Sequence, residues 1–317
     1  MPGMRNAGGI SSGTYSVSAG IRAARRRARA GAHAAGPAGG FPTFTFWPPL
    51  GYDTRMSTAP RIHAALSLDG LGTDARAAFD LAADAGYGGI ALPTKHPQVL
   101  SPGDFGDSAR RHFLNTLHHR HLTLDAIRIA APRNGLTDPA SIDRTLENAR
   151  KAFTLAHALG VKTVSLYAGP LANAKLSAET MAGAARVLAS EADRAGVTLA
   201  LSSESGKELQ TLLAAVAAEH FRANLDPAGL VAAGADALAV AAELGERIGQ
   251  FTAADAIRAG RQCRAVELDE GQVPLRELVE QLREQGFTGP TVVDVRDLGN
   301  AAVGARRAAE VLRGLGV

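Results

Sequence analysis

Short apolar runs alternate along this chain with longer stretches in which apolar residues recur every three or four positions, from Arg61 onward. The short runs have the length of β-strands, and the longer stretches have the periodicity of amphipathic helices. The predicted strands are Ile62–Ser67, Gly89–Leu92, Leu122–Ile127, Lys162–Tyr167, Val197–Ser202, Phe221–Asp226, Ile248–Ala253 and Thr291–Val295. The helices predicted to follow them span residues 74–85, 106–120, 141–159, 177–195, 206–218, 236–244, 274–285 and 300–314, with a short helical turn at 227–233.

Glycines stand in this pattern where a helix should end and the next strand should begin. Examples are Gly86, Gly160, Gly196 and Gly245, at positions where a left-handed glycine commonly ends a helix. Eight strand–helix units in one run predict an α/β protein, a single (β/α)₈ TIM barrel over residues 60–317. No Gly-x-Gly-x-x-Gly turn follows the first strand, so we expect neither a dinucleotide-binding sheet nor a nucleotide cofactor.

The first 56 residues differ in composition from the remainder of the chain. They form a low-complexity, Arg-rich leader with much Gly, Ala and Ser, and no periodicity in it would bury a face. We expect this leader to be disordered, or to be a mis-called start upstream of a biological start at Met56. An Arg-rich transit peptide also matches its composition.

The distribution of charge and cysteine limits the classes of partner. The formal net charge is +3, but residues 1–55 hold seven Arg and one acid, so they contribute +6 and leave −3 for the body. A negatively charged body would repel phosphates, so we expect no nucleic-acid partner. No apolar run approaches the ~20 residues of a membrane span, so we expect no membrane contact. The single Cys263 fits a reducing compartment and predicts a cytoplasmic location.

Polar residues follow the predicted strands at the positions where barrel enzymes keep their chemistry. Catalytic groups in this fold lie at the carboxyl ends of the strands, and Asp226 ends the sixth strand. Ser202, Thr252 and Asp294 hold the equivalent positions on the fifth, seventh and eighth strands. Side chains alternate along a strand, so we expect these four residues to face one mouth.

Further charged residues lie close to the same strand ends. Glu204 stands two residues beyond Ser202 and would point the same way if the strand continued. Arg296 stands two residues beyond Asp294, where it would supply positive charge in place of a metal or form a salt bridge that closes the mouth. We predict that these substrate-binding residues contact an anionic or hydroxylated ligand: Lys95, His96, Arg128, Tyr167, Asp255 and Arg296.

Seven short motifs follow one another in order along the body, at Leu66–Asp69, Ala77–Ile90, Ala156–Val164, Ala192–Leu201, Asn224–Ala228, Glu267–Val273 and Gly286–Val293. Their order and spacing resemble the sugar phosphate isomerase/epimerase family, which belongs to the xylose isomerase-like TIM barrel superfamily. The resemblance covers about residues 61–312. It implies a divalent metal at the barrel mouth, held by a Glu after strand five, an Asp after strand six, a His on strand seven and a Glu after strand eight.

This chain departs from that ligand set at three positions. Asp226 matches the Asp, whereas Ser202 stands for the first Glu, Thr252 for the His and Asp294 for the last Glu. The resemblance therefore implies a divalent metal, Mn²⁺ or Mg²⁺, held by Asp226 and Asp294 alone. We expect such a site to be weak, because hydroxyl groups replace two charged or imidazole ligands.

The resemblance implies carbohydrate metabolism as the function. The leading hypothesis is an isomerase or epimerase of a small carbohydrate, such as a sugar phosphate, which moves a proton next to a carbonyl group. Asp226, Asp294 and Glu204 are the predicted catalytic residues. The alternative is a non-catalytic TIM-barrel descendant that has lost the metal site and binds a small ligand or a partner. A third hypothesis is a metal-free lyase or hydrolase that uses Glu204 and Arg296.

Overall fold

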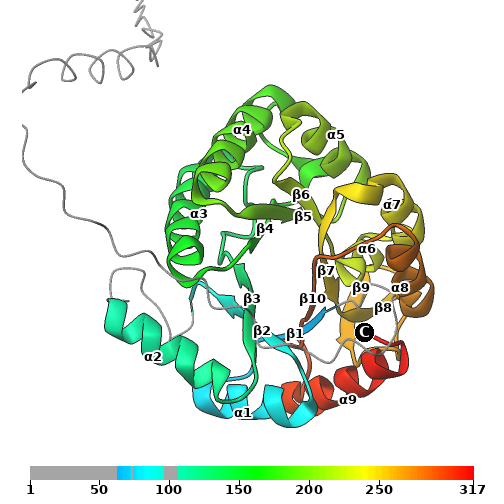
Figure 1. Cartoon of the computed structure of the whole chain (residues 1–317). Helices are drawn as coiled ribbons and strands as arrows, with labels where there is room; N and C mark the ends of the chain where they lie inside the picture. The colour runs from blue at the N-terminus through cyan, green and yellow to red at the C-terminus, as the bar shows by residue number, and fades with distance from the viewer. Residues whose placement is uncertain (1–62, 73, 96–105) are drawn as a thin grey trace, which may run out of the picture. The chain divides into compact units, whose positions relative to one another are not determined.

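A computed structural model describes residues 63–72, 74–95 and 106–317 of the chain. The predicted leader lies outside the described residues. Eight parallel strands close into a barrel in the order β1-β10-β7-β6-β5-β4-β3-β2, with helices around the ring (Figure 1). The barrel strands are β1 (His63–Ser67), β2 (Gly89–Pro93), β3 (Thr123–Arg128), β4 (Thr163–Tyr167), β5 (Thr198–Ser202), β6 (Phe221–Leu225), β7 (Ile248–Ala253) and β10 (Pro290–Val293).

Helices connect these strands on the outside of the ring. The α-helices are α1 (Ala75–Ala85), α2 (Asp107–His118), α3 (Pro139–Leu159), α4 (Ala178–Ala195), α5 (Gly206–Val216), α6 (Pro227–Ala233), α7 (Ala237–Leu244), α8 (Leu275–Glu284) and α9 (Ala301–Gly314). The described residues also include the 3₁₀ turns η3 (Leu171–Asn173) and η4 (Gly245–Arg247). The predicted (β/α)₈ barrel is confirmed, and each predicted strand and helix agrees with the structure to within two residues at its ends.

Local sequence explains why the helices begin and end at these residues. The Asp138 side chain accepts a hydrogen bond from the Ala140 amide, and Pro139 occupies the first turn of α3, where its missing N–H is not needed. Gly160 ends α3 in the left-handed conformation with φ of 73°, as the pattern predicted. None of the helices among the described residues combines the length and apolar character needed to cross a membrane.

The hydrophobic core lies mainly between the strands and the surrounding helices. Leu66, Ile90, Leu166 and Phe251 are among its fully buried side chains. A small separate cluster consists of Ala91, Ala126 and Val292. Ala91 and Val292 also line the cavity inside the barrel mouth. Small side chains on the strands therefore leave room for a cavity above this cluster.

One pair of strands lies outside the barrel and was not predicted. β8 (Asp255–Ala259) and β9 (Gln262–Val266) form an antiparallel hairpin between β7 and α8. Gly260 has a φ of 61°, which suits a two-residue hairpin turn. The segment contains alternating small and charged residues, which match neither the apolar runs of the barrel strands nor the periodicity of an amphipathic helix.

Candidate functional site

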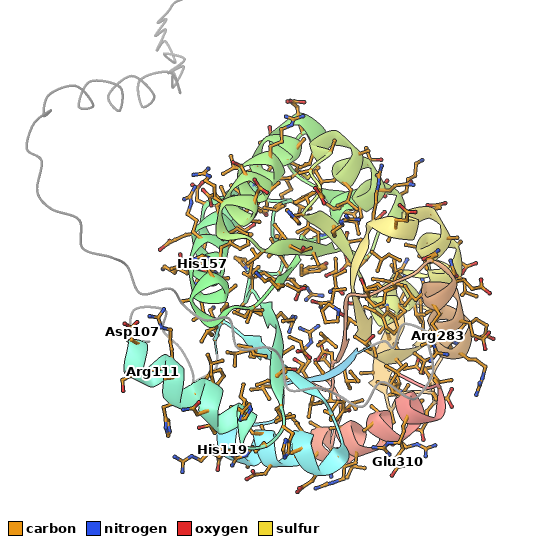
Figure 2. The ribbon with its side chains drawn as sticks, in the orientation of Figure 1. Asp107, Arg111, His119, His157, Arg283 and Glu310 are labelled. Carbon is orange, nitrogen blue, oxygen red and sulfur yellow. The ribbon has the colours of Figure 1, made fainter. Side chains whose placement is uncertain are left out.

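A cavity of about 760 Å³ opens at the carboxyl ends of the barrel strands. Each barrel strand contributes a lining residue; one from each is Ser67, Ala91, Arg128, Ser165, Ser202, Asn224, Thr252 and Val292, in chain order. Side chains also extend into the centre of the ring, whereas the labelled His157, Arg283 and Glu310 lie on the outer helices (Figure 2). The volume is in the range that binds small molecules.

Asp226 connects strand β6 to helix α6 at this mouth. Its Oδ1 accepts a hydrogen bond from the Gly229 amide at 3.1 Å and so caps the helix. Pro227 follows directly and fits the first turn of α6. Burial raises the pKa of the Asp226 carboxyl, while the hydrogen bond from Gly229 and the charge of Arg128 act in the opposite direction.

Asp294 follows strand β10 and contacts Arg296 through both of its oxygens. Oδ1 accepts a hydrogen bond from the Arg296 backbone amide at 3.2 Å, and Oδ2 lies 3.3 Å from Nη2 of the guanidinium. The Asp294 side chain is only 9% exposed. Burial raises the pKa of Asp294 to about 7, and the positive charge of Arg128 opposes this shift.

Arg128 and Arg296 also share a third carboxylate. Asp69, in the loop after β1, accepts a hydrogen bond from Arg128 Nη1 and lies 4.0 Å from Arg296 Nη1. Arg296 Nε is 3.4 Å from Oδ2 of Asp297. The end of β3 and the loops after β1 and β10 therefore meet in one network of alternating charges. Charge-assisted contacts of this kind orient the groups that make them.

Glu204 also lines the cavity, although strand β5 ends two residues earlier, at Ser202. The hydroxyl of Tyr167, at the end of β4, donates a hydrogen bond to Glu204 Oε1. Burial raises the pKa of Tyr167, and Glu204 adds to the shift. Tyr167 therefore remains a protonated donor at neutral pH and fixes the position of the carboxylate.

The remaining predicted metal-ligand positions have other partners. Thr252 donates its hydroxyl hydrogen to Asn224 Oδ1 at 2.9 Å. Asp294 Oδ1 accepts a hydrogen bond from the Arg296 amide, and Oδ2 forms an ion pair with the Arg296 guanidinium. Within the part of the chain that the structure describes, no three His, Cys, Asp or Glu side chains gather as metal ligands. The donor set thus does not fit a divalent metal, which requires several free oxygen or imidazole ligands.

Gln250, on β7, is 2% exposed and lines the cavity. Its Oε1 has no hydrogen-bond partner among the described residues. Buried polar atoms are normally paired, so this oxygen is a candidate acceptor for a ligand hydroxyl group.

The structure separates the predicted substrate-binding residues into groups. Lys95 and Arg133 are exposed and lie at the rim of the cavity, whereas His96 is outside the described residues. Asp255 is buried, and its carboxylate accepts hydrogen bonds from three backbone amides, those of Ala256, Gly271 and Val273. These bonds hold the start of β8 to the segment between β9 and α8, so the proposed site does not include Asp255.

A second cavity of about 430 Å³ adjoins the first beneath this hairpin. Asp226, Thr252, Asp294 and Arg296 line both cavities. Apolar residues, most of them alanines, line much of the second one, including Ala228, Ala232, Ala265 and Leu298. The hairpin therefore forms one wall of the mouth.

Sequence reasoning missed Asp69, Asn224 and Asp297 as members of the site. Asp69 and Asp297 follow the ends of β1 and β10, so the strand-end position that identified Asp226 would also have found them. Asn224 lies within β6, and nothing in the sequence links it to Thr252 on β7.

Comparison with known proteins agrees with this architecture. The family model described as xylose isomerase-like TIM barrel matches residues 79–315. No curated protein matches the chain at a significant level.

Three solved structures with similar folds illustrate the range of proteins that share this architecture. A xylose isomerase-like TIM barrel protein from Mycobacterium smegmatis in complex with magnesium has a TM-score of 0.65 and 16% identity, covering 82% of this chain and 97% of its own. The D-allulose 3-epimerase from Methylomonas sp. in complex with D-allulose has a TM-score of 0.62 and 18% identity, and the match covers 80% of this chain and 97% of its own. The probable 3-DHS dehydratase AsbF from Bacillus anthracis has a TM-score of 0.64 and 18% identity, and the match covers 80% of this chain and 98% of its own.

These structural similarities, at under 25% identity, establish the fold, and the family-model match covers most of the chain. The chain therefore belongs to the xylose isomerase-like TIM barrel family.

Proposed function

We propose that this protein is an isomerase or epimerase of a small carbohydrate, and that it moves a proton next to a carbonyl group. The observation that carries the proposal is the pair of carboxylates, Asp226 and Asp294, that line one cavity at the carboxyl ends of β6 and β10. Burial raises the pKa of both groups, to about 7 for Asp294. A carboxyl group with a pKa near neutrality exchanges protons efficiently in both directions.

The reaction is balanced by proton transfer alone. One deprotonated carboxylate takes the proton from the carbon next to the carbonyl, and the electron pair of that C–H bond forms a carbon–carbon double bond. The carbonyl oxygen gains the negative charge. Return of a proton to the opposite face of the same carbon gives the epimer. Return to the former carbonyl carbon gives the isomer, provided that the hydroxyl hydrogen on the neighbouring oxygen moves to the former carbonyl oxygen, so that the neighbouring oxygen becomes the new carbonyl.

The lining of the cavity favours a hydroxylated ligand. Ser67, Ser165, Ser202 and Ser203 line it together with the unpartnered oxygen of Gln250. Hydroxyl and amide groups bind sugar hydroxyls by donating and accepting hydrogen bonds. The D-allulose 3-epimerase with the same fold was solved with D-allulose bound, which supports a carbohydrate as the ligand class.

The cations at the rim favour a negative charge on that carbohydrate. Lys95 and Arg133 are exposed, and no ion pair involving either is present among the described residues. Arg128 and Arg296 lie deeper and pair with carboxylates. A phosphate or carboxylate group on the substrate would be attracted to these rim cations.

Solvent exchange tests the proposal without knowledge of the product. A panel of aldoses, ketoses, sugar phosphates and sugar acids is incubated with the protein in D₂O, and NMR detects deuterium incorporation next to the carbonyl. We expect exchange with at least one compound, and its loss in Asp226→Asn and Asp294→Asn. Exchange that persists in both variants would contradict the assignment of these carboxylates.

A second candidate is a non-catalytic protein that binds a small ligand in the same cavity. It is favoured by Ser202 and Thr252 at two positions of the implied ligand set, and by the hydrogen bond from Thr252 to Asn224. Binding without exchange would support it: a compound from the panel raises the melting temperature, and no deuterium enters that compound.

A further inference from the structure

Arg296 occupies the centre of a group of carboxylates at the barrel mouth. Its three side-chain nitrogens each face a different carboxylate: Nη2 is 3.3 Å from Asp294, Nε is 3.4 Å from Asp297 and Nη1 is 4.0 Å from Asp69. A guanidinium is planar and always charged, so it serves as a fixed cation with several directed donors. One positive group therefore lies where several negative ones converge.

The backbone holds this arginine in place. Gly70 has a φ of 85°, and a Cβ atom at this position would lie 2.3 Å from the Arg296 Cα. The loops after β1 and β10 therefore pack backbone against backbone at this glycine. The Arg296 amide also donates a hydrogen bond to Asp294 Oδ1 at 3.2 Å. Such packing limits the freedom of the side chain that carries the charge.

Arg296 contacts both oxygens of Asp294, one of the two carboxylates implied as metal ligands. A hard divalent cation binds carboxylate oxygens directly, at roughly 2.0–2.6 Å. Asp294 stands for the implied ligand on the last strand. Its Oδ1 accepts a hydrogen bond from the Arg296 backbone amide, and its Oδ2 faces the guanidinium. A divalent cation at this carboxylate would also lie close to a like charge, which repels it strongly where water is scarce.

We propose that the Arg296 guanidinium takes the place of the divalent metal in this barrel. It neutralises Asp294 and Asp69, and the residue lines the cavity that a ligand would enter. The catalytic part rests on the proposed function: as the proton leaves carbon, the guanidinium stabilises the negative charge that develops on the carbonyl oxygen. The guanidinium stays protonated throughout, so it takes part in no proton transfer.

The inference predicts a gain of metal binding when the arginine is removed. Arg296→Gln would free the carboxylates of Asp294 and Asp297 and remove one of the two cations beside Asp69, which keeps its contact with Arg128. Carboxylates are hard oxygen ligands suited to Mn²⁺. We expect the wild type to bind Mn²⁺ only weakly in an EPR titration. The variant should bind it at least ten-fold more tightly and gain several degrees of melting temperature in millimolar Mn²⁺. Adding Asp294→Asn to the variant should abolish this gain.

Arg128→Gln is the matched control, because it removes a guanidinium from the same cavity but leaves Asp294 in contact with Arg296. It should gain no affinity for Mn²⁺. Arg296→Met, which keeps the apolar stem, is a second variant should Arg296→Gln not fold.

Two results would overturn the inference. One is that the wild type binds Mn²⁺ with a dissociation constant below about 100 μM and that Asp294→Asn abolishes this binding. This measurement requires no variant of Arg296. The other is a folded variant of Arg296 that gains no metal affinity. These titrations use no substrate, so they test the inference even if no compound of the carbohydrate panel exchanges a proton.

Discussion

The raised pKa of Asp294 makes the stability of this barrel depend on pH in a predictable direction. Its folded-state pKa is about 7, against an ordinary value of 3.8. The protonated form is therefore favoured in the folded state, and the stability gained from it is fully present below pH ~4 and is lost as the pH rises through ~7. Between pH 5 and pH 8 the expected loss from this one group is about 2–3 kcal/mol, by the proton linkage of a single site.

Asp294→Asn removes the titration of this carboxyl group and so isolates its contribution to stability. Asparagine resembles the protonated carboxyl group and still accepts the hydrogen bond from the Arg296 amide. Urea unfolding at pH 5 and pH 8 measures the free energy of unfolding of both proteins. Between pH 5 and pH 8, the free energy of unfolding of the wild type should fall by about 2–3 kcal/mol relative to that of the variant. Asp297→Asn, in the same loop and 76% exposed, is the control and should show no such change. A change below about 0.5 kcal/mol in Asp294→Asn, or one in the opposite direction, would refute the reasoning.

Three further predictions concern the core, the hairpin and the site. Phe251→Ala removes a fully buried ring of the barrel and should lower the free energy of unfolding by about 3–5 kcal/mol, measured in urea; Val303→Ala, at an exposed position, should change it by less than ~0.5 kcal/mol. Asp255→Ala breaks three hydrogen bonds to backbone amides, so trypsin should cut at Arg261 at least about ten-fold faster through local opening, and an unchanged rate would count against this role. Glu204→Gln keeps the acceptor for Tyr167 but not the charge, and should slow the solvent exchange by about 10²-fold; a rate within about two-fold of wild type would remove Glu204 from the catalytic set.

The fold was predictable because strand and helix periodicity, helix caps and glycine positions all act locally. The same local pattern found Asp226 and Asp294, since the end of a parallel strand fixes the side of the barrel on which a residue lies. The residues that contact Asp226 and Asp294 were harder to predict from the sequence. The contact between Asp69 and Arg128 joins the loop after β1 to the end of β3, and a sequence does not specify which charges meet across a mouth. The sequence had left two roles open for Arg296, and the observed contacts with carboxylates are the basis for choosing between them.

The β8–β9 hairpin also gives the protein a built-in position for a spectroscopic label. Cys263, the single cysteine of the chain, is exposed on β9 and lines the second cavity. A thiol-reactive fluorophore would attach there uniformly, without any engineered residue. Its emission would report whether a compound has entered the mouth, and this would permit screening of large metabolite collections before any reaction is known.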